Sequence, residues 1–228
     1  MVLLGASASL VSLGRALAGS TAVSVVLGVA AMLVTGSLVE WLVHGQLMHR
    51  RWRWLKLPYE LHHRAHHWIH YPPNVYLRDQ VTYVPVTRSE LHRIAHGGEE
   101  AVAAAGQGAF YASFIAPIVA PAWWLTHNLA FAIAAAVTGA ALVFLAVHVH
   151  DSVHCPGHSP LERFRWFWAL DRHHYLHHID TKANRNFLLP LADLLLGTLR
   201  TEPTALERSR WPSYETARRT VRPVERSI

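Results

Sequence analysis

The stretch TAVSVVLGVAAMLVTGSLVEWLVHGQLMH, residues 21–49, joins a long apolar run to a pair of histidines. Residues 21–43 are all apolar or small except Glu40, and the run leads directly into His44 and His49. An α-helix needs about 20 such residues to cross about 30 Å of hydrocarbon. The stretch therefore predicts a transmembrane helix that carries metal-ligating side chains at its end.

Two further apolar runs, residues 108–125 and 129–149, have a length that suits a membrane span. We expect them to form a hairpin that turns around residues 123–128. The segment 3–19 is shorter and is interrupted by Arg15, so a fourth span, a re-entrant piece and an interfacial helix all remain open. A cleaved signal peptide is disfavoured because no basic residues precede the apolar run. The sequence predicts an all-α, multi-pass membrane protein.

The composition agrees with one membrane domain rather than a soluble enzyme. The chain has 228 residues, which suits a single domain over 1–228, and 51% of them are hydrophobic. It also holds 18 histidines but one cysteine, Cys155. A single cysteine excludes an internal disulfide framework and any multi-cysteine metal site. A metal bound by this chain must therefore be held by nitrogen and oxygen.

The basic residues indicate which side of the membrane the polar segments face. All but one of the 21 Lys and Arg residues lie within 50–93 and 163–226, and the exception is Arg15. The positive-inside rule places both stretches, and with them the histidine clusters, in the cytoplasm. The net charge of +6 is then explained by topology and anionic headgroups, so no nucleic-acid partner is expected. The polar tail, 202–228, is expected to be peripheral.

The histidines fall into four clusters that follow the apolar runs. Two clusters share the pattern HHxxHH, at 62–67 and 173–178, and each comes after a span that ends in a spaced histidine pair. Residues three and four apart share one face of an α-helix, which favours His63 over His62 and His174 over His173. Both choices stay open. The candidate ligands are His44, His49, His63, His66, His67, His150, His154, His174, His177 and His178.

Ten imidazoles are too many for one ion and suit two, because a metal usually takes four to six ligands. Packed together without a metal, their unpaired donors and acceptors would cost about 1–3 kcal/mol each. Ligating histidines normally donate their second N–H to a carboxylate or carbonyl group. Four side chains are candidates for contacts of this kind around the ligands: Glu40, Asp151, Asp180 and Asn186.

The complete set of motifs resembles the fatty acid hydroxylase superfamily, the sterol desaturase-like membrane di-iron proteins. The matching motifs are HxxxxH at His44/His49, HxxHH at His63/His66/His67, HxxxH at His150/His154, HxxHH at His174/His177/His178, and the segment from Asn186 to Thr198. The resemblance implies a helical membrane domain with a cytoplasmic cap that holds two iron ions, for which zinc can substitute. It also implies O2-dependent hydroxylation of a lipid: a fatty acyl chain, sphingolipid, sterol or carotenoid.

The resemblance leaves the substrate and the electron donor open. Gly45 follows His44 where an arginine is common in relatives, and the HDSVH sequence at 150–154 is similar to that of bacterial carotenoid hydroxylases. We expect no attached cytochrome b5-like domain, and therefore expect electrons from a separate reductase, ferredoxin or cytochrome b5-like protein. The alternatives are a lipid desaturase, an aldehyde-processing oxidase on the same scaffold, and a non-catalytic metal-binding or transport protein of the membrane.

Overall fold

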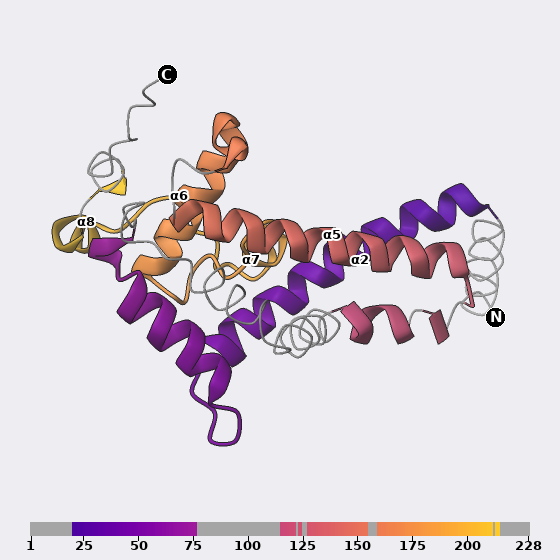
Figure 1. Ribbon diagram of the computed structural model, residues 1–228, viewed down its shortest axis with the longest axis horizontal. Coiled ribbons are helices and arrows are strands. Elements are labelled where there is room, and N and C mark those ends of the chain that lie inside the picture. The colour runs from indigo at the N-terminus through magenta and orange to yellow at the C-terminus, as the bar shows by residue number, and fades with distance from the viewer. Residues whose placement is uncertain are drawn as a thin grey trace, which may run out of the picture. The chain divides into compact units, whose positions relative to one another are not determined.

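The structure is a computed structural model that describes residues 20–76, 115–121, 123–124, 127–154, 159–211 and 213–214. These residues form helices, turns and loops, with no strand among them (Figure 1). The expected all-helical fold is thus confirmed for the described part of the chain. The chain divides into two compact units, residues 1–36 with 108–143 and residues 37–107 with 144–228. The prediction of a single domain stays a prediction.

The first unit pairs the amino-terminal parts of helices α2 (Thr21–Leu42) and α5 (Leu129–His154). Asn128 donates a hydrogen bond from Nδ2 to Ser24 Oγ, and a Cβ at Gly28 would collide with the carbonyl of Phe131. Further along both helices, a Cβ at Gly139 would lie 3.1 Å from Met32 Cε. Residue numbers at these contacts increase together along both helices, so in this unit α2 and α5 run parallel.

Two helices of the described residues are long and apolar enough to cross a membrane, Thr21–Met48 and Leu129–His154. In the most apolar part of either helix only 22% of the residues are buried, and the others are half-buried or exposed. The expected span 108–125 is described only from residue 115, where 115–121 and 123–124 are helical. The segment 3–19 lies outside the described residues.

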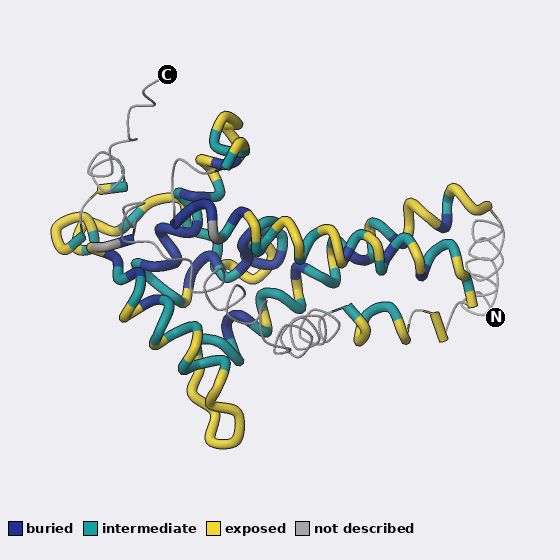
Figure 2. The backbone as a smooth tube through the Cα atoms, viewed as in Figure 1, coloured by how far each residue is buried: buried dark blue, intermediate teal, exposed yellow. Residues whose placement is uncertain are grey.

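The second unit contains short helices around the polar carboxyl-terminal half. In chain order they are η1 (Val43–Met48), η2 (Tyr59–His70), η3 (Pro73–Val75), η4 (Pro160–Arg163), α6 (Arg165–Ile179), α7 (Leu191–Leu195) and α8 (Ala205–Arg210). Ser159 and Glu162 form a capping box at the start of η4, and Pro160 occupies its first turn. Helix α6 begins directly afterwards. The buried residues of this unit gather on α6 and on the segment that follows it (Figure 2).

Packing fixes α6 beside the last turns of α5. Val149 and Val153 of α5 form a buried cluster with Phe167 of α6 and with Phe187 of the following loop. Each of these side chains is at most 6% exposed, and burying an aliphatic or aromatic side chain stabilises a fold by about 1.5–3 kcal/mol. The cluster therefore holds the histidines of α5 and α6 against one another.

Helices η1 and η2 are π-helices, with hydrogen bonds from residue i+5 to residue i. The same register continues at their ends, where His49 N donates to His44 O at 3.1 Å and Tyr71 N donates to His66 O at 2.8 Å. A π-helix has more residues per turn than an α-helix, so residues four and five apart share a face. Such turns are rare and are found mostly at functional sites.

Candidate metal centre

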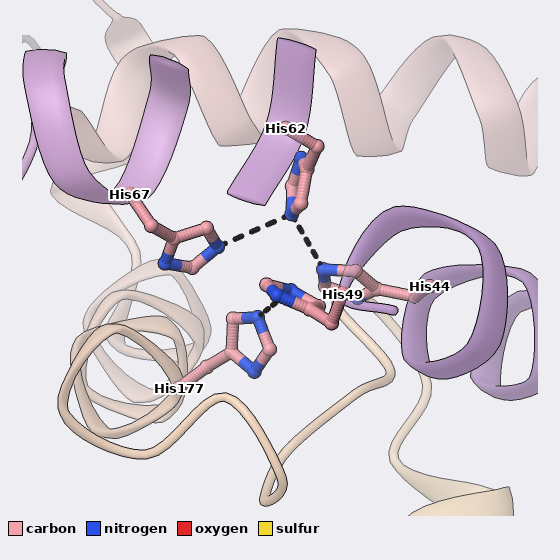
Figure 3. A group of neighbouring side chains, drawn as sticks. All are labelled: His44, His49, His62, His67 and His177. Carbon is pink, nitrogen blue, oxygen red and sulfur yellow. Dashed lines mark hydrogen bonds between the residues drawn. The ribbon is translucent and has the colours of Figure 1, made fainter. Parts of the chain in front are cut away.

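Three overlapping groups of imidazoles form in the second unit, and in each group the potential ligand nitrogens all lie within 4.8 Å of one another. The groups are His44, His49, His62, His67 and His177; His66, His150, His154 and His174; and His66, His67 and His178. Figure 3 shows the first group, in which side chains from η1, η2 and α6 point toward one another. The first two groups share no residue, so the arrangement can hold two ions.

Pairs of ring nitrogens face each other at short range in the first group. The Nε2 atoms are 2.8 Å apart between His44 and His62, 2.9 Å between His49 and His177, and 3.2 Å between His67 and His62. Two nitrogens bound at right angles to a metal about 2.1 Å away lie about 3.0 Å apart. The spacing of the rings therefore suits ligation of a common transition metal.

The second group has the same geometry around His174. Its Nε2 atom lies 3.1 Å from Nε2 of His154 in the same group, and 3.1 Å from Nε2 of His178 in the third group. The ring centroid of His150 is 4.7 Å from those of both His66 and His174, which closes the group.

The nitrogens on the outer side of these rings face backbone carbonyl oxygens. His154 Nδ1 donates to Tyr76 O at 3.0 Å, and His178 Nδ1 donates to Tyr71 O at 2.8 Å. In the first group His177 Nδ1 donates to Ala183 O at 2.7 Å. His44 Nδ1 donates in the same way to the carbonyl of Arg185. A carbonyl oxygen only accepts, so these four rings carry their proton on Nδ1 and present a lone pair at Nε2.

Facing lone pairs need a cation between them. His154 and His178 both present an Nε2 lone pair to His174, and one proton on His174 Nε2 cannot serve both. His66 Nε2 and His67 Nδ1 are buried and have no hydrogen-bond partner in the described part of the chain. A metal ion satisfies several lone pairs at once, and second-nitrogen bonds to carbonyls are typical of metal-bound histidines. The donor set therefore fits a nitrogen-ligated transition metal.

Burial keeps the rings in the neutral form that metals require. Desolvation lowers the pKa of His62, His66 and His67 on η2 well below the usual 6.5. It has the same effect on the pKa of His174, His177 and His178 on α6, and the neighbouring imidazoles lower these values further. At neutral pH these six residues are neutral imidazoles rather than cations.

The structure brings together nine of the ten expected ligands, and His63 is the exception. His62 takes the place expected for His63 because η2 is a π-helix, in which residues five apart, such as His62 and His67, share a face. The preference for His63 assumed an α-helix. His63 instead lies outside the groups, where its Nδ1 is 2.8 Å from His49 Nδ1 and its Nε2 accepts from Trp68 at 3.2 Å.

On α6 the expected member of the HHxxHH pattern belongs to a group. This element is an α-helix, so His174, His177 and His178 lie on neighbouring faces of it, and each belongs to a different one of the three groups. His173 points away from the groups and donates from Nε2 to Asn186 O at 2.7 Å.

The expected carboxylate contact of Glu40 differs in the structure. No described hydrogen bond joins Glu40 to an imidazole; its carboxylate accepts from Asn186 Nδ2 at 3.0 Å and Phe187 N at 2.9 Å. Asn186 also donates to Ser37 O at 2.7 Å. Glu40 and Asn186 therefore fix the loop after α6, and this loop supplies the carbonyls that orient His44 and His177.

The other two expected carboxylates are not seen in contact with the imidazole groups. Asp180 follows α6 and accepts from Arg200 Nη1 at 2.9 Å and Lys182 N at 3.0 Å, so it organises the turn. Asp151 lies on α5 beside His150, and its side chain is outside the described part of the structure.

Three features of the site were not predicted by the sequence analysis. Asp193 is fully buried and accepts from Arg185 N at 2.9 Å and Asn186 N at 2.7 Å, which holds the loop from the other side. Tyr71 and Tyr76 act through their backbone carbonyls. Any residue type can supply a backbone carbonyl, so the contacts of Tyr71 and Tyr76 have no sequence signal. Asp193 lies within the segment from Asn186 to Thr198, which is one of the matching motifs.

No protein-family model, curated protein or solved structure matches this chain. The geometry of the imidazole groups and the four histidine motifs are therefore the features of this chain that bear on its function.

Proposed function

We propose that this protein is a membrane di-iron oxygenase that hydroxylates a lipid with O2 and electrons from a separate donor protein. The proposal is supported above all by the orientation of the imidazole rings of His154, His177 and His178. Each ring directs Nε2 toward another imidazole and donates from Nδ1 to a backbone carbonyl. All ten grouped side chains are histidines, and an all-imidazole set suits iron, zinc or copper. The motifs that resemble the fatty acid hydroxylase superfamily favour iron among these.

Each part of the chain has a defined task in this proposal. Bound iron would supply O2 activation and the removal of hydrogen from an unactivated C–H bond. The loop after α6 holds His44 and His177 in one orientation through its carbonyls, which preorganises the ligands before a metal binds. The cluster around Phe167 and Phe187 excludes water from one side of the second group, since His174 lies 5.0 Å from the Phe187 ring.

The membrane part of the proposal is supported by the two apolar helices. Because α2 and α5 run parallel in the first unit, an odd number of crossings must connect them, and residues 108–125 are the apolar run available for one. We place the histidine groups on the cytoplasmic side by the positive-inside rule. Retention in the membrane after carbonate extraction, with a carboxyl-terminal reporter active only in the cytoplasm, is the expected result. A periplasmic or lumenal reporter would contradict this topology.

Metal content of the purified protein tests the core of the proposal. Elemental analysis should find about two irons per chain, or two zincs that iron can replace. His177→Ala and His174→Ala should each lose about one ion, because they belong to different groups. His148→Ala is the matched control: it lies two residues before His150 on α5, is exposed and belongs to no described group. No metal in the wild type, or equal metal in all four proteins, would refute the centre.

A loaded protein then separates the catalytic alternatives. With an electron donor and lipid, hydroxylation consumes O2 and adds its oxygen to the product, which 18O2 labelling detects. Desaturation would give a product with a new double bond and no label. Metal without any O2 consumption would favour a non-catalytic metal-binding protein.

A further inference from the structure

Arg185 carries a guanidinium group in a tightly packed position beside the first imidazole group. Its Cζ atom lies 4.6 Å from the centre of the Trp41 ring, over which it stacks. A Cβ at Gly45 would lie 2.7 Å from Arg185 Nη1 and 2.8 Å from Nε, so this side chain occupies the space that a residue larger than glycine would need. Gly45 adjoins His44, a member of the group. The cation is therefore held next to the imidazoles by steric fit.

The guanidinium has no counter-ion among the described residues. Its Nε atom is buried without a hydrogen-bond partner there, and none of the described ion pairs involves Arg185. Arg200 shows the usual situation, since its side chain is 22% exposed and pairs with both Asp180 and Glu207. A buried donor left unsatisfied is unfavourable, more so when it belongs to a charged group.

The backbone around Arg185 is fixed on both sides. Its N–H donates to Asp193 Oδ1 at 2.9 Å, and its carbonyl accepts from His44 Nδ1. Because these two hydrogen bonds hold the backbone, the loop cannot shift to bring the guanidinium group to a hydrogen-bond partner. Trp41 and Gly45 lie near the end of the apolar helix Thr21–Met48, where the polar headgroups of a bilayer would lie. Guanidinium binds carboxylate and phosphate through paired hydrogen bonds. The oxyanion of an amphipathic molecule could therefore supply the negative charge and the hydrogen-bond acceptors that the described residues do not give Arg185.

We propose that Arg185, stacked on Trp41 and accommodated by Gly45, binds the oxyanion headgroup of an amphipathic substrate next to the metal centre. This inference rests on the proposed function and narrows its substrate class to lipids with an anionic group. Sterols and carotenoids, which are uncharged, fall outside that class.

Binding of three probes with the same apolar chain tests the proposal: hexadecanoate, hexadecyl phosphate and uncharged hexadecan-1-ol. Radiolabelled probes are measured against metal-loaded protein in an uncharged detergent. The wild type should prefer at least one anion over the alcohol, and the preferred anion identifies the headgroup as carboxylate or phosphate. Arg185→Gln should weaken the binding of that anion by about tenfold or more and leave the binding of the alcohol unchanged. Gly45→Ala should have the same effect because it displaces the guanidinium while the charge is kept.

Two controls separate this subsite from general effects. Arg53 stacks over Trp54 in an exposed loop, so Arg53→Gln removes a stacked cation elsewhere and should leave the preference intact. Gly36→Ala adds a methyl group to α2 at an ordinary 3.6 Å from Met32 Sδ and should also leave it intact. Metal content is measured on every protein, and a metal-free wild type would refute the proposed function whatever the probes show. The anion site would be refuted if Arg185→Gln weakened binding of the anion and of the alcohol equally, or if Arg53→Gln weakened anion binding as much as Arg185→Gln. It would also be refuted if metal-loaded Arg185→Gln and Gly45→Ala kept the preference for the anion over the alcohol.

Discussion

The Nε2 atoms of His62 and His67 lie 3.2 Å apart, although the two residues are separated by five positions in η2. In an α-helix this separation turns the second side chain well away from the first. The π-helical register of η2 returns both to one face and moves His63 out of the first group. The hydrogen-bond register of one helix thus selects the ligands from a run of four histidines.

His62→Ala and His63→Ala should therefore differ in metal content. We expect His62→Ala to lose about one ion per chain, because Nε2 of His62 faces both His44 and His67. His63→Ala should keep both ions when metal is in excess, with affinity lowered by about 10–100-fold, since His63 contacts the ring of His49. Elemental analysis at excess and at limiting iron measures both effects. The opposite order of the two variants would show that η2 is α-helical in the metal-bound protein.

Asp193→Ala should destabilise the loop that orients the ligands. The buried carboxylate accepts from two backbone N–H groups and from Thr198 Oγ1 at 2.6 Å, and each donor left unsatisfied costs about 1–3 kcal/mol. We expect the free energy of unfolding in detergent to fall by about 3 kcal/mol or more, together with metal affinity. Glu202→Gln is the control, because Glu202 is 53% exposed and its ion pairs contribute about 0–1 kcal/mol. Unchanged stability of Asp193→Ala would contradict this role.

The apolar helices and the histidine-bearing helices could be predicted because their signals are local. The predicted spans 21–43 and 129–149 correspond to helices Thr21–Leu42 and Leu129–His154, which the run lengths alone indicated. The histidine-bearing part of helix α6 was indicated by the spacing of the HHxxHH pattern at 173–178. In these cases the information lies within one turn or one run of sequence.

The ligand register and the supporting contacts could not be predicted, because they depend on residues distant in sequence. Glu40 meets Phe187 across 147 positions, and no spacing rule connects the two. The expectation that Glu40 contacts a ligating histidine did not take account of the loop after α6, whose Asn186 and Phe187 bind the carboxylate. The preference between His62 and His63 was left open for a related reason: the sequence of η2 does not reveal that its hydrogen bonds run from i+5 to i, the register that puts His62 in the first group.

Gly28→Leu should destabilise the first unit without removing ligands. A Cβ at position 28 would collide with the Phe131 carbonyl and approach Ala134 Cβ to 3.1 Å, so the two helices would have to separate. Small residues permit close packing of helices in a membrane. We expect a loss of about 1–3 kcal/mol in thermal unfolding, whereas Gly36→Leu, at a less crowded position, should lose less. Equal stability of the two variants would show that the α2–α5 contact is looser than described.

The ion pair of Arg200 and Glu207 predicts a pH-dependent part of the stability. Arg200 Nη2 lies 2.6 Å from Glu207 Oε2, and the two side chains are 22% and 20% exposed. The hydrogen bond from Arg200 lowers the pKa of Glu207 from 4.5 to about 2. A carboxyl whose pKa is lowered on folding stabilises the fold above its unfolded pKa, and the stabilisation is lost as the pH falls through the folded value. The affected window therefore extends from about pH 4.5 down to about pH 2.

Glu207→Gln measures this contribution directly. Glutamine keeps an oxygen that can accept from Thr204 N, so the cap of α8 is preserved while the charge is removed. We expect the variant to be less stable than the wild type by about 1–2 kcal/mol at pH 6, and the difference to shrink steadily below about pH 4.5. Glu202→Gln is the control variant, because it removes a carboxylate from exposed ion pairs that contribute about 0–1 kcal/mol. Because Arg200 N also donates to Asn184 Oδ1 at 2.7 Å, the same variant should loosen the loop after α6 and raise hydrogen exchange there. A difference that stayed constant down to about pH 3 would mean that Arg200 does not depress this carboxyl.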